Sequence, residues 1–265
     1  MKIGFFQFSP YHGKKNKNIE KIIDIIKKSK AELIVFPELA TSGYLIPDKN
    51  FLKENSFSIP ESREFEELFK VVKKTGTAAI IGFPEKFKDK FYNSALYILP
   101  NGKFGVYRKI HLFYKEKLFF EKGENPDSGI FEYKGFRFGI IICYDWFFPE
   151  HIRYLAIKKK IHMVLHPANL ILPWGQRAMR IRAIENRIFT LTCNRIGEEK
   201  YKNDHYIFTG KSQIVSPKGE IIVRATSKKE SLRISKINLK EAEDKSLNRY
   251  NIIHEDIKEF PLFSV

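Results

Sequence analysis

The chain has 265 residues, and its 43% hydrophobic content, with 24 Phe and 12 Tyr, is ample for a large buried core. No apolar run approaches the length of a membrane span, and two cysteines are too few for a disulfide framework, so we expect reduced thiols. The net charge of +16 would permit nucleic-acid binding, but the lysines are scattered and no nucleic-acid motif accompanies them. We therefore expect one domain over residues 1–265, with no nucleic-acid partner and no membrane association.

The N-terminal part of the chain alternates predicted strands and helices. Residues 2–8 alternate as a strand, and this run is too short and too strand-like for a signal peptide, so we expect a cytoplasmic protein. Isoleucines recur at helical spacing over 19–26, and the apolar strand 32–36 then stops at a proline. Glu38 follows directly, which places a carboxylate just beyond a strand end. A surface carboxylate or one at a helix N-terminus is the alternative interpretation.

A lysine ends the next predicted hairpin. After a helix over 64–74 and a strand over 77–82, two strand-like runs, 91–99 and 104–110, are joined by Pro-Asn-Gly-Lys, a strong hairpin signal. Lys109 lies at the end of the second run. An isolated lysine there could serve only to prevent pairing between sheet edges.

A cysteine ends the following hairpin. Strands 130–133 and 136–142 lead to Cys143, and a proline begins the predicted helix 149–159 shortly after it. Nucleophiles are often placed at such a strand-to-helix junction, where the backbone N–H of Tyr144 could face an oxyanion. A buried core cysteine is the alternative.

The rest of the chain continues the alternation. In the predicted helix 176–187, Ala178, Ile181 and Ile184 are expected to face inward, with Ala183 as a further candidate, and Cys193 is expected to be a structural residue on a buried strand. The other predicted elements are strands over 161–166, 188–193, 207–215, 220–225 and 231–237, a short helix from about Leu239 and an irregular tail. Strands that alternate with helices and hairpins predict a layered α/β protein with mixed sheets.

Glu38, Lys109 and Cys143 all lie at predicted strand ends, where ligand sites collect in open α/β sheets. A carboxylate near a thiol can take its proton and later activate water, while an ammonium group stabilises a tetrahedral intermediate. Attack on an amide-like carbon would release ammonia or an amine and leave a thioester. Spacing alone does not show that the three groups meet.

The segments FPELATSGY, YRKIHLF and CYDWFFPE, in this order, resemble the three motifs of the nitrilase superfamily of carbon-nitrogen hydrolases. RAIENRIFTLTCNRIG is similar to the usual continuation, so the resemblance covers essentially the whole chain. It implies that Glu38 is the general base, Lys109 the motif lysine and Cys143 the nucleophile. It also implies a second glutamate soon after the lysine, for which we choose Glu116, with Glu121 as the competitor.

The same resemblance implies an αββα sandwich with two mixed sheets, commonly paired across a dimer interface into αββααββα, and no metal or organic cofactor. Cys-Tyr-Asp is closer to the amidase-like and carbamoyl-hydrolase branches than to large nitrilases, in which Trp-Glu follows the cysteine. Other segments, such as HPANLILP, are similar to those of small prokaryotic and archaeal aliphatic nitrilases. We therefore expect a homodimer or higher oligomer that hydrolyses a small amide or nitrile through a thioester on Cys143. The alternatives are an N-carbamoyl amine or amino acid amidohydrolase and a non-catalytic binding protein on the same fold.

Aromatic residues near the three motifs predict the substrate pocket, although core packing is the alternative for each of them. Such a pocket would suit a small, fairly apolar substrate. The predicted substrate-binding residues are Tyr44, Phe113, Tyr144, Trp146 and Asn169, with Tyr114, Phe147 and the rest of 169–174 as further lining candidates.

Histidines offer a different catalytic hypothesis. A Cys-His hydrolase would use His111, His151 or His166 as its base. His162 and His166 are four residues apart, but they lie on a predicted strand with no intervening glutamate motif, so we do not expect a zinc site.

Overall fold

Two six-stranded sheets form the centre of the computed structural model, which describes residues 1–259. In spatial order, the first sheet contains β14 (Ser231–Lys236), β1 (Lys2–Gln7), β2 (Leu33–Val35), β3 (Ala78–Phe87), β4 (Lys90–Ile98) and β5 (Phe104–Arg108). The second contains β13 (Ile221–Arg224), β12 (Gln213–Val215), β9 (Phe189–Asn194), β8 (Met163–Ala168), β7 (Phe136–Ile140) and β6 (Ile130–Tyr133).

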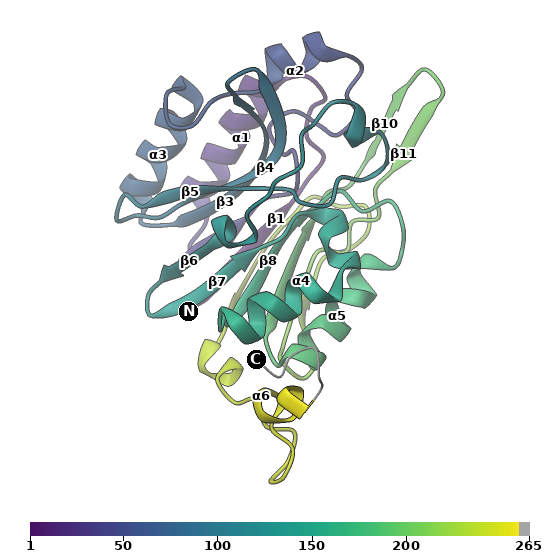
Figure 1. Ribbon diagram of the computed structural model, residues 1–265. Helices are drawn as coiled ribbons and strands as arrows, with labels where there is room; N and C mark the ends of the chain where they lie inside the picture. Colours follow the sequence, from purple (N-terminus) through teal and green to yellow (C-terminus); the bar gives the residue numbers. More distant parts are fainter. Residues whose placement is uncertain (260–265) are drawn as a thin grey trace.

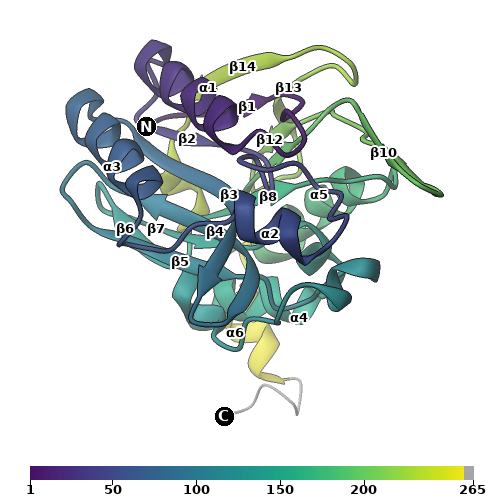
Figure 2. The ribbon, with the colours of Figure 1, turned by 90° about the horizontal axis from the view of Figure 1, so that it is seen from above.

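Both sheets are mixed. Strands β1, β2 and β3 run parallel, as do β7, β8 and β9, and the outer strands of each sheet add antiparallel pairs. A separate two-stranded hairpin, β10 (Glu198–Tyr201) with β11 (Asp204–Ile207), projects away from both sheets (Figures 1 and 2).

Helices cover the outer faces of the sheets. The α-helices are α1 (Lys15–Lys28), α2 (Lys49–Asn55), α3 (Arg63–Thr75), α4 (Pro149–Arg153), α5 (Gly175–Asn186) and α6 (Ile253–Asp256). Short 3₁₀ segments are η1 (Tyr114–Leu118), η2 (Pro126–Gly129), η3 (Cys143–Phe147), η5 (Leu239–Ala242) and η6 (Ile257–Glu259), and η4 (Tyr154–Lys158) is a π-helical turn. Helices α1 and α3 lie on the first sheet and α4 and α5 on the second, which gives the expected αββα sandwich (Figure 1).

Alternation along the strands builds two packed interfaces. In β2, Leu33 and Val35 belong to the core between the sheets, which includes Phe138 and Leu165 of the second sheet. Ile34, between them, packs in the cluster that includes the buried faces of α1 and α3. Because successive side chains of a strand point to opposite faces, a strand buried on both faces is apolar throughout.

The predicted strand over 207–215 is wrong as a continuous element. It is divided between β11 and β12, and Gly210 (φ 58°) and Lys211 (φ 56°) interrupt it in left-handed conformations that lie outside the φ range of a regular strand. The predicted helix over 149–159 is α-helical only as far as Arg153 and continues as the π-helical turn η4.

The predicted inward face of α5 is also wrong in part. Ile181 and Ile184 are 53% and 39% exposed, whereas Gln176, Met179 and Ala183 are buried. Gln176 can be buried because its side-chain nitrogen donates to the Thr209 hydroxyl and to the carbonyl of Gly210 at 2.9 Å each.

The C-terminal part carries more structure than an irregular tail, because α6 and η6 follow η5. The end of the predicted tail, 260–265, lies outside the described residues. Among the described helices, none has the length and apolar character that crossing a bilayer requires.

Candidate active site

Glu38 lies three residues beyond β2, in a turn that is fully buried. Its Oε1 accepts hydrogen bonds from Nζ of Lys109 at 2.7 Å and from Nδ2 of Asn93 at 2.8 Å. Its Oε2 has no hydrogen-bond partner among the residues that the structure describes. One oxygen of this buried carboxylate is therefore free to accept a proton.

Gly82 of β3 lets the turn with Glu38 approach the sheet closely. A Cβ atom at position 82 would lie 2.3 Å from the carbonyl oxygen of Pro37 and 2.6 Å from Cα of Glu38. Any side chain there would push the turn outward, so the glycine sets the depth at which the carboxylate lies.

Lys109 follows the last residue of β5 and is fully buried. Its ammonium lies between two carboxylates, 2.7 Å from Oε1 of Glu38 and 2.8 Å from Oε2 of Glu116. Burial alone would lower the pKa of Lys109, but the charges of Glu116 and Glu38 raise it above its ordinary value. The lysine is therefore an ammonium ion at neutral pH.

Glu116 of η1 is the second glutamate in contact with the lysine. It also accepts a hydrogen bond from the Tyr44 hydroxyl at 2.9 Å and one from the backbone N–H of Phe113 at 3.2 Å. Burial raises its pKa, and the charge of Glu38 adds to this effect against the opposing influence of Lys109. The competitor Glu121 is 55% exposed and pairs with Lys90 at 3.8 Å.

Cys143 begins η3, three residues after β7, and is 6% exposed. Its φ of 41° is in the left-handed region, which non-glycine residues adopt only where the surrounding structure enforces it. Because η3 begins here, the N–H of Tyr144 is in a first turn, where helices leave N–H groups without intrahelical partners. The predicted strand-to-helix junction is confirmed, with a tight turn at its centre.

The thiol of Cys143 is electrostatically coupled to the charged cluster. Burial raises its pKa well above the ordinary value, and the charge of Glu38 raises it further, while Lys109 and the backbone N–H of Asn169 act in the opposite direction. The sulfur is therefore a neutral thiol at rest, and its use as a nucleophile requires a base.

A largely apolar cavity of about 220 Å³ opens beside Cys143. Tyr44 and Tyr114 do not line it, since Tyr44 contacts Glu116 and Tyr114 is 60% exposed. Pro173, within the predicted range 169–174, does not line it either. The other predicted pocket residues do, and they are Phe113, Tyr144, Trp146, Phe147, Asn169, Leu170, Ile171, Leu172 and Trp174.

The three candidate histidines have different surroundings. Both ring nitrogens of His166 are engaged, Nδ1 with the Thr192 hydroxyl at 3.1 Å and Nε2 with the carbonyl oxygen of Cys143 at 3.0 Å. His111 is bonded to Asp145 at 2.7 Å, and His151 has no hydrogen-bond partner among the described residues. His166 therefore supports the backbone of the turn at Cys143, and the carboxylate whose charge acts on the thiol is that of Glu38.

Residues 2–245 match the family described as carbon-nitrogen hydrolase. A nitrilase from Pyrococcus abyssi is 40% identical over 264 residues, which are 98% of each chain. This chain belongs to the carbon-nitrogen hydrolase family.

Further relatives of this carbon-nitrogen hydrolase include an omega-amidase from Xenopus tropicalis, 31% identical over 80% of each chain. Among solved structures, XC1258 from Xanthomonas campestris, a CN-hydrolase superfamily protein, has a TM-score of 0.81 at 20% identity and covers 100% of this chain and 96% of that one. An amidase from Nesterenkonia sp. has a TM-score of 0.77 at 23% identity, with 92% of each chain covered. These structural likenesses support the fold. The protein is a hydrolase of carbon-nitrogen bonds other than peptide bonds.

Several residues around the site of this carbon-nitrogen hydrolase were not predicted from the sequence. Asn93 lies in the middle of β4, yet it donates to Glu38, and its carbonyl accepts the N–H of Lys109 at 2.9 Å. Glu199 of β10 is 6% exposed and accepts the N–H groups of Tyr44 and Leu45 at 3.0 and 2.7 Å. The hydrogen-bond partners of Asn93 and Glu199 are distant in sequence, so no local motif marks either residue.

Proposed function

We propose that this enzyme hydrolyses small amides or nitriles, with Cys143 as the nucleophile, Glu38 as the general base and Lys109 as the group that stabilises the developing negative charge. The observation that carries the proposal is the geometry of Glu38, whose Oε1 lies 2.7 Å from the Lys109 ammonium and whose Oε2 has no hydrogen-bond partner among the described residues. The charge of the same carboxylate raises the pKa of the Cys143 thiol. The cluster contains an acceptor for the thiol proton and a cation for the intermediate.

For an amide, the sulfur of Cys143 attacks the carbonyl carbon while Glu38 takes the thiol proton. The oxyanion of the tetrahedral intermediate is stabilised by Nζ of Lys109 and by the N–H of Tyr144. Glu38 returns the proton to the leaving nitrogen, ammonia departs, and the C–S bond of a thioester remains. Water, deprotonated by Glu38, then attacks the thioester, and the products are a carboxylic acid and the thiol.

For a nitrile, addition of the thiol to the C≡N carbon gives a thioimidate. One water converts it to a tetrahedral intermediate, loss of ammonia gives the same thioester, and a second water releases the acid. Glu116 would act in both cases by holding the lysine ammonium from the side opposite Glu38, with Tyr44 orienting its carboxylate.

The cavity supports a small and fairly apolar substrate, because most of its lining is aromatic or aliphatic and its volume is about 220 Å³. Asn169 is the amide side chain in this lining. An N-carbamoyl amine or amino acid is the second candidate, and a larger polar group would have to lie at the rim, where Phe147 and Trp174 are 50% and 54% exposed.

The thiol mechanism draws support from a structural neighbour. In a glutamate-to-glutamine mutant of an amidase from Nesterenkonia sp., acrylamide has undergone Michael addition at the active-site cysteine. We propose the same chemical role for Cys143, the cysteine at the cavity.

The test combines ammonia release with intact-protein mass spectrometry on small amides, aliphatic nitriles and carbamoyl compounds. The wild-type enzyme should release ammonia from one class and carry an acyl adduct, and Cys143→Ala should do neither. Cys193→Ala is the matched control, because Cys193 is buried on β9 away from the cavity lining and should tolerate the change. Full ammonia release by Cys143→Ala would contradict the thiol mechanism, and a wild-type enzyme inactive on all three classes would favour the binding-protein alternative.

We further propose a homodimer in which the α5 faces of two protomers meet, because Ile181 and Ile184 expose large aliphatic side chains there. We also propose a cytoplasmic location, because a nucleophilic thiol must remain reduced to function.

A further inference from the structure

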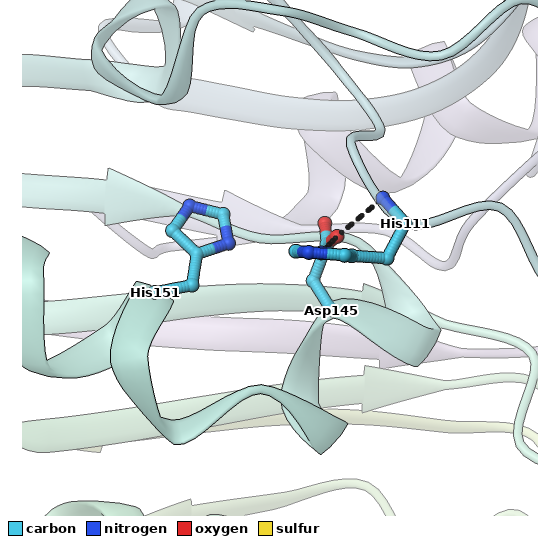
Figure 3. Close-up of side chains that lie close together, drawn as sticks. All are labelled: His111, Asp145 and His151. Atoms are coloured by element: carbon cyan, nitrogen blue, oxygen red, sulfur yellow. Dashed lines mark hydrogen bonds and ion pairs between the residues drawn. The ribbon is translucent and has the colours of Figure 1, made fainter.

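His111, Asp145 and His151 lie side by side (Figure 3). They are next to the turn over residues 142–145, which contains Cys143 and which we call the cysteine turn. Asp145 is the second residue after Cys143 within η3 and is fully buried, whereas the two histidines come from the segment after β5 and from α4. Three potential ligand atoms, one from each side chain, lie within 4.8 Å of one another.

Hydrogen-bond donors of the protein already surround the carboxylate of Asp145. Its Oδ1 accepts from the backbone N–H of His111 at 3.0 Å and from Nδ1 of the same residue at 2.7 Å (Figure 3). Its Oδ2 accepts from the Tyr107 hydroxyl at 2.7 Å and from the N–H of Ile142 at 2.9 Å. A carboxylate has about four lone-pair positions, so these donors fill it.

This saturation decides between two interpretations of the cluster. A metal ion bound to Asp145 would have to displace donors that have no other acceptor among the described residues, at a cost for each buried group left unpaired. The donors also keep the carboxylate ionised, because they lower the pKa of Asp145 against the effect of burial. The geometry therefore favours an internal clamp over a metal site.

The positions of the donors in the sequence show what is clamped. Tyr107 and His111 lie two residues before and two residues after Lys109, and Ile142 directly precedes Cys143. The N–H of Asp145 donates to the carbonyl of Ile142 at 3.0 Å, and this hydrogen bond closes the cysteine turn. The carboxylate of Asp145 thus connects residues 107–111, which contain Lys109, with the cysteine turn.

We propose that Asp145 is a positioning residue that fixes the Lys109 ammonium relative to the Cys143 sulfur. The inference rests on the proposed function, since it concerns the alignment of the same two groups. Asp145 acts through them and does not touch the substrate.

Asp145→Asn is the main test. The amide keeps the size of the side chain, but its NH₂ group faces two donors, so the two segments lose part of their connection. We expect kcat to fall by about 10²-fold with KM little changed, because a displacement of about 1 Å has that effect on an aligned reaction. Wild-type kcat in this variant would overturn the proposal.

A double-mutant cycle separates positioning from general stability. In a Lys109→Ala background the alignment is already lost, so Asp145→Asn should lower the residual kcat by much less than it does in the wild-type enzyme. A merely structural role predicts the same fold-loss in both backgrounds, and that result would also overturn the proposal.

Glu85→Gln is the matched control. Glu85 is 3% exposed, so it is also a buried carboxylate. It accepts hydrogen bonds from Ser94 and from Arg108, the last residue of β5, but it has no hydrogen bond to the cysteine turn. The control should lower stability without the 10²-fold loss in kcat.

Two further measurements keep the proposal testable. If circular dichroism shows that Asp145→Asn does not fold, Tyr107→Phe and His111→Ala replace it, because each removes one side-chain donor. Wild-type kcat in both variants would overturn the clamp.

If the wild-type enzyme hydrolyses none of the substrates, the proposed function fails separately. The rate at which iodoacetamide alkylates Cys143 then serves as the readout, and equal rates in wild type and Asp145→Asn would overturn the clamp.

Discussion

Glu38 carries the feature on which the proposed reaction depends, an oxygen without a hydrogen-bond partner among the described residues. Glu38→Gln keeps an oxygen for Lys109 and Asn93 but cannot take a proton. We expect kcat to fall by about 10²- to 10⁴-fold, the usual contribution of a general base, in assays of ammonia release. Glu121→Gln, at the exposed glutamate that competes for the motif position, should keep wild-type kcat, and equal losses in both variants would contradict the assignment.

His166 predicts a dependence of stability on pH. Burial lowers its pKa from 6.5 to about 4, so the folded protein keeps the ring neutral while the unfolded chain binds a proton below pH 6.5. The stabilising contribution is complete above pH 6.5 and is lost as the pH falls toward 4, with a total of about 3 kcal/mol.

Urea unfolding at pH 7 and pH 4.5 measures this effect. The free energy of unfolding of His166→Gln should fall less on acidification than that of the wild-type protein. His205→Gln, at a histidine 39% exposed on the hairpin, is the control and should follow the wild-type protein. A parallel decrease in all three proteins would exclude His166 as the source.

At the scale of single residues, the sequence predicted Glu38, Lys109 and Cys143, which lie in recognisable motifs. It did not predict the residues that hydrogen-bond to them. Glu38 and Cys143 follow apolar runs that stop abruptly, Lys109 lies at the end of a predicted hairpin strand, and the structure places all three in one buried cluster. Asn93 lies within an ordinary strand, and its role arises only when β4 pairs with its neighbours. Hydrogen bonds between residues far apart in sequence leave no local pattern.

The hairpin β10–β11 connects to the site through one buried ion pair. The Arg195 guanidinium is fully buried, donates to Glu199 at 2.5 Å and lies 4.0 Å from the centre of the Phe208 ring. Glu199 in turn accepts the N–H of Tyr44, whose hydroxyl donates to Glu116. The hairpin thereby orients the second glutamate of the site.

Glu199→Gln tests this connection. It leaves the buried Arg195 without its anion, so we expect the free energy of unfolding in urea to fall by about 3 kcal/mol. We also expect kcat to fall, because the connection from Glu199 through Tyr44 to Glu116 is weakened. Glu198→Gln, one residue earlier and 56% exposed, should change stability by less than about 0.5 kcal/mol. Equal effects in the two variants would show that the ion pair is not important.

Element prediction succeeded where burial follows a continuous apolar run or a helical period. Strands β1 to β3 are mostly apolar runs buried on both faces, and helices α1 and α3 are buried by apolar side chains at spacings of three to four residues. It failed for α2, whose seven residues are too few for a period, and for the exposed hairpin β10–β11. It also misplaced the buried face of α5, where Gln176 is buried through hydrogen bonds while Ile181 is exposed.

For the whole molecule, the mixed sheets and the αββα layers are as expected, whereas the single domain over 1–265 and the oligomeric state remain predictions. The exposed isoleucines of α5 give the latter a direct test. Light scattering should report a dimer for the wild-type protein and a monomer for Ile181→Asp combined with Ile184→Asp, because buried carboxylates oppose association. Ile222→Asp, at an isoleucine of β13 that is 42% exposed, should remain dimeric. A wild-type monomer would contradict the proposed assembly.

The raised pKa of the Cys143 thiol has a consequence for the lifetime of the enzyme. Peroxides attack cysteine through its thiolate, so a sulfur that is stored with its proton is oxidised slowly to the sulfenic acid. In the proposed reaction the sulfur loses that proton only while it attacks bound substrate. Oxidative damage should therefore accumulate with the number of turnovers rather than with the age of the protein.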